Sequence, residues 1–212
     1  MNSSETPGRY EAEPPLVIVT GFGPFPGVTD NPSEMLLREL ERAQMSDGLR
    51  HEFVLLETAY RHVSDRVAEL LARRPAVVIH LGYISTAAML CLECRATSKR
   101  STSHPDVTGF TPYTKTPPTV LENRRVNFTE LLTELAAAGI PAQLSHDAGT
   151  YVCNHTYFTV LNAIRHAGLQ TKALFVHIPM VSELEAPRAG VMGLATMAEG
   201  VRLIARRMAG VG

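Results

Sequence analysis

Short apolar runs alternate along the chain with longer stretches in which apolar residues recur every three or four positions. The short runs have the length and polar boundaries of buried strands, and they lie at residues 16–20, 51–57, 76–81, 89–97, 140–144 and 173–178. The longer stretches have the period of amphipathic helices, and they lie at residues 31–43, 63–72, 128–138, 153–167 and 196–208. This alternation predicts an α/β fold, with helices on both faces of a twisted, mostly parallel but mixed central sheet, in three α/β/α layers.

The same pattern sets the predicted domain bounds. Residues 1–15 are polar and contain prolines, so we expect them to be a disordered lead-in. Residues 16–212 contain neither a repeat nor a linker and are expected to form a single domain. Within this domain, residues 98–119 are rich in proline and threonine, which indicates a long connection.

Composition and charge exclude several classes of protein. A chain of 212 residues, 45% of them hydrophobic, is long enough to bury one sizeable core. Its net charge of −1, with no basic block, argues against an electrostatic nucleic-acid binder, and no apolar run approaches the ~18 residues of a membrane span. Three cysteines, an odd number in a chain of this length, do not make a disulfide framework, which favours a reducing, cytoplasmic compartment.

Cys153 is the candidate nucleophile. It lies in the segment Ala-Gly-Thr-Tyr-Val-Cys-Asn at residues 148–154, where a Gly-Thr turn leads into the helix predicted at residues 153–167. A thiol in the first turn of a helix feels the positive end of the macrodipole and nearby unpaired N–H groups, which favours the thiolate. A free cysteine is more often a small buried hydrophobe, so this position alone leaves a structural role open.

A nucleophilic cysteine needs a base, and His177 is the candidate. It lies near the end of the short apolar strand predicted at residues 173–178. A side chain that can carry charge is unusual in such a buried strand, which indicates a functional role. His155 is closer to Cys153 in sequence, but residues two apart on a helix do not face each other. We therefore expect a structural or supporting role for His155.

Two other groups of reactive side chains are interpreted as structural. Cys91 and Cys94 form a C-x-x-C pattern, which could serve as a redox pair or as half of a zinc site. In a strand over residues 89–97, residues three apart point to opposite faces, and the chain has no second C-x-x-C or H-x-x-x-H. We also expect structural or supporting roles for His80 and His146, and no bound metal.

Four segments, considered together, resemble the motifs of a known protein family. They are Thr-Gly-Phe-Gly-Pro-Phe at residues 20–25, Asn-Pro-Ser at residues 31–33, residues 148–154, and Val-His-Ile-Pro at residues 176–179. In order and spacing over residues 17–208 they resemble the pyroglutamyl peptidase I (pyrrolidone-carboxylate peptidase) family. The resemblance implies an α/β/α cysteine peptidase that removes an N-terminal 5-oxoproline from small peptides with a Cys-His-Glu triad. It also implies that no metal or organic cofactor is required, and that the protein is cytoplasmic and a homo-oligomer, often a homotetramer.

The resemblance identifies Glu93 as the third member of the triad. The family places its glutamate eleven residues after the glycine that ends the preceding strand and three before an alanine, and Gly82, Glu93 and Ala96 reproduce that spacing. A carboxylate is the group that would hold His177 in the right tautomer and stabilise its imidazolium form. The alternative is that Glu93 is an ordinary exposed carboxylate on a strand.

Three aromatic residues are candidates for substrate binding. Phe22 and Phe25 can sandwich a flat, uncharged lactam ring, whose amide needs only a few placed hydrogen bonds. The alternative is that both side chains fill the core of a tight turn. Tyr151, two residues before Cys153, occupies a position where the family often has an aromatic residue facing the same pocket.

The segment after Gly82 departs from the family. The family usually continues Gln-Ala-Gly-Gly-Arg, whereas this chain reads Gly-Tyr-Ile-Ser-Thr-Ala at residues 82–87, and a further family arginine falls on Ser103. Loss of a glycine pair predicts a different backbone path beside the pocket and a weaker kcat/KM. Two other functions therefore stay open, a same-fold cysteine hydrolase of another small amide or N-blocked peptide, and a non-catalytic protein that binds pyroglutamyl ends.

Overall fold

The computed structural model describes the chain except for residues 1–12, 44–46, 114–116, 185–189 and 212. The lead-in predicted at residues 1–15 therefore falls almost wholly outside the described residues. In the described part, no helix is long and apolar enough to cross a membrane.

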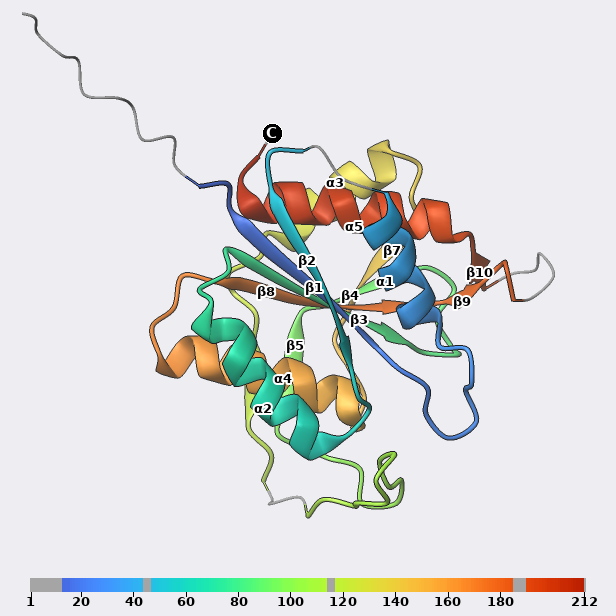
Figure 1. The fold of residues 1–212 in the computed structure, drawn as a ribbon, viewed down its shortest axis with the longest axis vertical. Coiled ribbons are helices and arrows are strands. Elements are labelled where there is room, and N and C mark those ends of the chain that lie inside the picture. Colours follow the sequence, from blue (N-terminus) through green and yellow to red (C-terminus); the bar gives the residue numbers. More distant parts are fainter. Residues whose placement is uncertain (1–12, 44–46, 114–116, 185–189, 212) are drawn as a thin grey trace, which may run out of the picture.

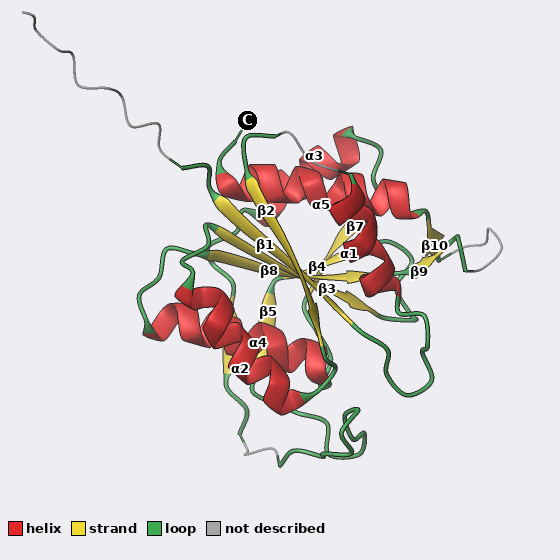
Figure 2. Ribbon diagram, in the orientation of Figure 1, coloured by secondary structure: helices red, strands yellow, loops and turns green. Residues whose placement is uncertain are grey.

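A six-stranded sheet forms the middle layer of the molecule (Figures 1 and 2). Its strands lie in the order β2-β1-β3-β8-β4-β7, with the bounds β1 Leu16–Phe22, β2 Arg50–Leu56, β3 Val77–Tyr83, β4 Leu90–Glu93, β7 Ala142–Ser145 and β8 Lys172–Ile178. All neighbouring strands are parallel except β4 and β8, which are antiparallel. Strands β4 and β7 consequently run opposite to the other four, which confirms the predicted mostly parallel, mixed sheet.

Helices cover both faces of this sheet (Figure 2). The helices of the described residues are α1 Pro32–Arg42, α2 Tyr60–Ala72, α3 Phe128–Ala137, α4 Val152–His166 and α5 Leu194–Ala209. Buried side chains of α1, α3 and α5 form one apolar core with the sheet, and those of α2 and α4 form a second core on the opposite face. The predicted three-layer α/β/α arrangement is confirmed.

The alternation of side chains along β8 decides which face carries the chemistry. Leu174 belongs to the core shared with α1, α3 and α5, whereas Phe175 belongs to the core shared with α2 and α4. Because successive side chains of a strand point to opposite faces, His177 lies on the same face as Phe175. That face is covered by α4, the helix that begins next to Cys153.

The prediction of a single strand at residues 89–97 is wrong, because the chain forms two strands there. The chain forms β4 and then β5 Arg95–Thr97, which leaves the main sheet and pairs with β6 Val120–Glu122 in a separate two-stranded sheet. The break falls at Cys94, whose N–H donates to the carbonyl of Ser145. Strand β6 and the two-residue strands β9 Met180–Val181 and β10 Val191–Met192 were not predicted, because two or three residues are too short to show a period of two.

Candidate active site

Strand pairing brings Glu93 and His177 together. In the antiparallel register Cys91 lies opposite His177, and Glu93 lies opposite Phe175. Glu93 and His177 are therefore diagonal neighbours on one face of the sheet, within reach of each other's long side chains. Oε1 of Glu93 lies 2.8 Å from Nδ1 of His177, and the two residues are 1% and 3% exposed.

Cys153 approaches this pair from the start of α4. It is the second residue of the helix, it is half-buried, and Tyr151 occupies the N-cap. Its sulfur lies beside Gly82, which is paired with His177 between β3 and β8. A Cβ atom built on Gly82 would lie 3.0 Å from Sγ of Cys153 and 2.7 Å from the ring of Phe175, so this position requires a glycine.

The histidine is held in its charged form. Burial lowers the pKa of His177, but hydrogen bonds and charge interactions with Cys153 and Glu93 outweigh burial and raise this pKa to about 9. Nδ1 of His177 is occupied by Glu93, which leaves Nε2 as the ring nitrogen for Cys153. At neutral pH His177 is therefore an imidazolium that can give a proton to a leaving group.

We predict that Gly82→Ala lowers kcat/KM by roughly ten- to a hundredfold, because the added methyl group displaces the Cys153 sulfur, and displacements of ~1 Å cost that much. Gly193→Ala is the matched control, since its added Cβ would meet nothing closer than 3.5 Å. Steady-state kinetics and the melting temperature of both variants separate misplacement from unfolding. An unchanged kcat/KM in folded Gly82→Ala would show that the thiol does not depend on this contact.

Two residues that sequence reasoning missed support Glu93. Tyr157 donates its hydroxyl to the backbone oxygen of Glu93 over 2.8 Å, and Asn123 donates Nδ2 to the same hydroxyl over 2.8 Å. Both residues are buried, and the other oxygen of the Glu93 carboxylate has no hydrogen-bond partner among the described residues. Tyr157 fitted the apolar pattern of its helix, so nothing in the sequence distinguished it from an ordinary core residue.

Asn154, the residue after the candidate nucleophile, fastens the chain that follows β5 to α4. Its side chain accepts the N–H of Thr97 and donates to the carbonyls of Thr97 and Lys99, over distances of 2.8 to 2.9 Å. Asn154 is 1% exposed. Its place within the cysteine motif was the one available signal for this role.

The three aromatic candidates occupy different environments. Phe22 is 2% exposed, and its ring centroid lies 6.4 Å from that of Phe175, so it packs in the core behind the site. Phe25 is half-buried, in a tight turn closed by two backbone hydrogen bonds with Val28. Tyr151 is half-buried, and its pKa is raised by burial and by the nearby charges of Asp106 and Cys153.

The Asn-Pro-Ser motif holds the loop that carries these phenylalanines. Asn31 caps α1 by accepting the N–H of Ser33, and its Nδ2 donates to the carbonyl of Gly23 over 2.8 Å. The hydroxyl of Ser33 bonds both backbone groups of Phe22. Both side chains are buried, so the motif acts as a clamp between β1 and α1.

The segment that departs from the family forms a tight turn. The N–H of Ala87 donates to the carbonyl of Ile84 over 3.1 Å, and the N–H of Ile84 donates to Ile178 at the end of β8. Within the described residues, the one non-glycine residue with positive φ is Arg74. Ser85 and Thr86 therefore form this turn without a left-handed backbone conformation.

The remaining cysteines have separate partners. Cys91 accepts a hydrogen bond from Gln143, and Sγ of Cys94 lies 3.0 Å from Nδ1 of His146. Burial raises the pKa of both thiols. In the part of the chain that the structure describes, no three His, Cys, Asp or Glu side chains are grouped so that they could hold a metal ion.

Two of the other histidines are neutral and buried. Nδ1 of His80 lies 2.7 Å from the hydroxyl of Thr20, and complete burial lowers the pKa of His80 to about 3. Burial and the charge of Arg100 lower the pKa of His155 to about 4, and its Nε2 lies 3.1 Å from the hydroxyl of Ser64 and 3.2 Å from the carbonyl oxygen of Tyr60. Neither ring can serve as an acid at neutral pH.

Comparison with known proteins identifies a family to which the chain is similar. A family model described as pyroglutamyl peptidase matches residues 16–209. Pyrrolidone-carboxylate peptidase 1 of Ralstonia nicotianae is 33% identical over 198 residues, covering 89% of this chain and 90% of that protein. The pyrrolidone-carboxylate peptidase of Thermococcus onnurineus is 31% identical over 197 residues, covering 89% of this chain and 96% of that protein.

Solved structures share the fold. Pyroglutamyl peptidase I of Bacillus amyloliquefaciens superposes with a TM-score of 0.81 at 24% identity, covering 92% of this chain and 97% of the other. A mutant pyrrolidone carboxyl peptidase of Pyrococcus furiosus superposes with a TM-score of 0.80 at 22% identity, with the same coverage of 92% and 97%.

Proposed function

This chain belongs to the pyroglutamyl peptidase family of cysteine peptidases, and on that premise we propose that it hydrolyses the amide bond after an N-terminal pyroglutamyl residue. We assign the chemistry to Cys153, His177 and Glu93. The observation that supports this assignment is the buried pair of Glu93 and His177, whose Oε1 and Nδ1 atoms lie 2.8 Å apart, with the Cys153 sulfur beside Gly82, the β3 residue paired with His177. The complete constellation favours a peptidase over a protein that only binds pyroglutamyl ends.

In the acylation step, the Cys153 thiolate attacks the carbonyl carbon of the pyroglutamyl residue. The oxyanion that forms can be met by backbone N–H groups at the start of α4, because the first turn of a helix leaves these donors unpaired. His177 gives its proton to the amide nitrogen, the C–N bond breaks, and the shortened peptide leaves with a free amino group. A thioester between Cys153 and the pyroglutamyl group remains.

In the deacylation step, His177 is neutral and takes a proton from a water molecule. The hydroxide equivalent attacks the thioester, the C–S bond breaks, and free pyroglutamate leaves. The Cys153 thiolate and the His177 imidazolium are restored. Glu93 holds Nδ1 of the ring throughout, so Nε2 stays directed at the reacting atoms.

For the substrate ring, we propose contacts with Phe25 and Tyr151 and a supporting role for Phe22. Phe25 and Tyr151 are half-buried, as an apolar wall for a small lactam requires, whereas Phe22 is in the core beside Phe175. The proposed substrates are small peptides with this blocked N-terminus.

A panel of fluorogenic amides tests this function. We expect turnover of the pyroglutamyl amide and at least tenfold lower kcat/KM for the prolyl, alanyl and acylated amides, because an unmade hydrogen bond to a buried polar group costs ~1–3 kcal/mol. Preference for a prolyl or acylated amide would instead support the same-fold hydrolase of another small amide. Binding of pyroglutamyl peptides without turnover would support the non-catalytic alternative.

The turn at Ser85 and Thr86 allows a further prediction. The sequence alone predicts that loss of the glycine pair weakens kcat/KM, but neither residue has a positive φ. We therefore now expect that changing both to glycine leaves kcat/KM within about threefold and lowers the melting temperature by about 2–8 °C through the greater entropy of the unfolded chain. Changing both to alanine is the matched control, which should leave both quantities almost unchanged. A large rise in kcat/KM for the glycine pair would show that the departure from the family weakens substrate recognition.

We also propose a cytoplasmic homo-oligomer. The free cysteines Cys91, Cys94 and Cys153 fit a reducing compartment. The outer strands of the sheet carry Leu55 and Leu144, which are 45% and 38% exposed and could be covered by another copy. Sedimentation velocity tests the assembly, and a monomer at micromolar concentration would contradict it.

A further inference from the structure

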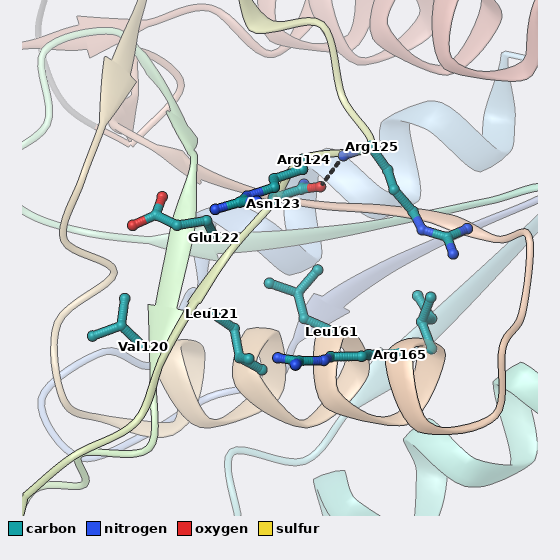
Figure 3. A pocket seen from close by; sticks show the side chains of 9 residues that line it. Val120, Leu121, Glu122, Asn123, Arg124, Arg125, Leu161 and Arg165 are labelled. Carbon is teal, nitrogen blue, oxygen red and sulfur yellow. Dashed lines mark hydrogen bonds between the residues drawn. The ribbon is translucent and has the colours of Figure 1, made fainter.

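A pocket lies between the chain at β6 and the C-terminal half of α4 (Figure 3). Its volume is about 490 Å³, which is in the range of small-molecule sites. Leu161, its lining residue closest in sequence to Cys153, is eight residues further along α4, or ~12 Å at 1.5 Å per residue. None of the three proposed triad residues lines this pocket.

The lining of this pocket combines an apolar floor with basic walls. Leu121 and Ile164 are buried and Leu161 is half-buried, and together they form the floor. Arg124 and Arg165 extend in the same direction along its opposite sides, with Leu161 between them in the view of Figure 3. A ligand in this pocket would contact the apolar side chains of the floor, and the guanidinium groups would lie at the edges of the ligand.

The charges of the pocket are unbalanced. Arg124, Arg125 and Arg165 line it together with a single acidic residue, Glu122. Among the described residues, no ion pair joins any of these three arginines to a carboxylate. Unpaired guanidinium groups gathered around an apolar hollow favour an anion with an apolar body and disfavour a cation.

The strand side of the pocket is fixed in place before any ligand arrives. Asn123 is buried, and its Nδ2 donates to the hydroxyl of Tyr157 on α4 and to the carbonyl of Ala173 on β8, each over 2.8 Å. Its Oδ1 accepts the N–H of Arg125. These bonds tie the backbone beside Arg124 to both neighbouring elements, so little ordering of the backbone is required on binding.

We propose that this pocket binds a small organic carboxylate that carries an apolar chain. The carboxylate lies between Arg124 and Arg165, whose planar guanidinium groups can each donate two parallel hydrogen bonds to it. The chain covers Leu161 and Ile164. A free short-chain acid and the carboxyl end of a peptide share this chemistry.

Titrations followed by the backbone amide signals of residues 120–125 and 161–165 test the site, with hexanoate as the probe. We expect saturable shifts in the millimolar range or below, with hexanoate binding about tenfold more tightly than hexanamide, which lacks the charge, or acetate, which lacks the chain. If acetate binds as tightly as hexanoate, the site is a general anion patch that does not recognise the chain. If hexanamide binds as tightly as hexanoate, the site is an apolar hollow that does not recognise the charge. Either result, or the absence of saturable shifts, overturns the proposal.

Variants localise the site. Arg124→Gln and Arg165→Gln should each weaken hexanoate about tenfold or more, whereas Arg38→Gln, an exposed arginine on α1, should have no effect. Because Arg124 and Arg165 are exposed, both variants should keep the melting temperature and the peptidase activity of the parent. Unaltered hexanoate binding in the two folded variants contradicts the assignment.

A further arm of the titration separates the two sources of ligand. Acetyl-alanyl-leucine, compared with its C-terminal amide, is the probe for a peptide end. If acetyl-alanyl-leucine binds more tightly than hexanoate and its amide does not bind, the site is assigned to peptide carboxyl ends. If hexanoate binds more tightly than acetyl-alanyl-leucine, the site is assigned to free acids. Both results keep the carboxylate chemistry.

Discussion

Cys153→Ala should lower kcat by at least about ten-thousandfold while leaving the fold and the melting temperature almost unchanged, because the nucleophile is lost and the thioester cannot form. The thiol is half-buried at the start of α4, so its removal leaves little cavity. Turnover of a pyroglutamyl amide, together with circular dichroism, measures both effects.

Cys94→Ala is the matched control for this variant. Cys94 contacts His146, and its loss should leave kcat within about threefold. Iodoacetamide should inactivate the parent protein with alkylation at Cys153, because burial raises the pKa of the Cys91 and Cys94 thiols and keeps them protonated. Full activity of Cys153→Ala, or of protein fully alkylated at Cys153, would remove this residue from the mechanism.

Glu93→Gln should lower kcat by about a hundred- to ten-thousandfold and change KM much less. The amide keeps the size of the side chain but removes the charge that orients His177 and stabilises its imidazolium form. His177→Ala should be at least as damaging. A kinetically silent Glu93→Gln would mean that another carboxylate orients the ring.

The pH profile distinguishes orientation from simple structural damage. The pKa of His177 is raised to about 9, so the imidazolium is present below that pH and kcat/KM should fall as pH rises through it, when the leaving amine loses its proton donor. Glu93→Gln removes one of the interactions that raise this pKa, and the alkaline limb should move to lower pH. Glu122→Gln, at an exposed position on β6, is the control and should leave the limb in place. A fixed limb in a folded Glu93→Gln would contradict the proposed contact in solution.

The sequence by itself determined the layered α/β class and the positions of most strands and helices, and it predicted Cys153 and His177 as the candidate nucleophile and base. These features depend on short stretches of chain. The period of apolar residues distinguishes strand from helix, Asn31 is a local cap, and the placement of Cys153 at a helix start needed only the turn before it. Glu93 was identified from the resemblance of the chain to a family, since nothing local distinguished it from other carboxylates on strands.

The tertiary structure alone decided how these residues meet. Strand β4 runs antiparallel to β8, and its register places Glu93 diagonally to His177, while the missing side chain of Gly82 makes room for the Cys153 sulfur. The supporting bonds of Tyr157 to Glu93 and the burial of Phe22 behind Phe175 join parts of the chain far apart in sequence. Strand direction and register result from the packing of whole layers, and a shift of one residue would turn Glu93 to the other face, so no local pattern could specify this site.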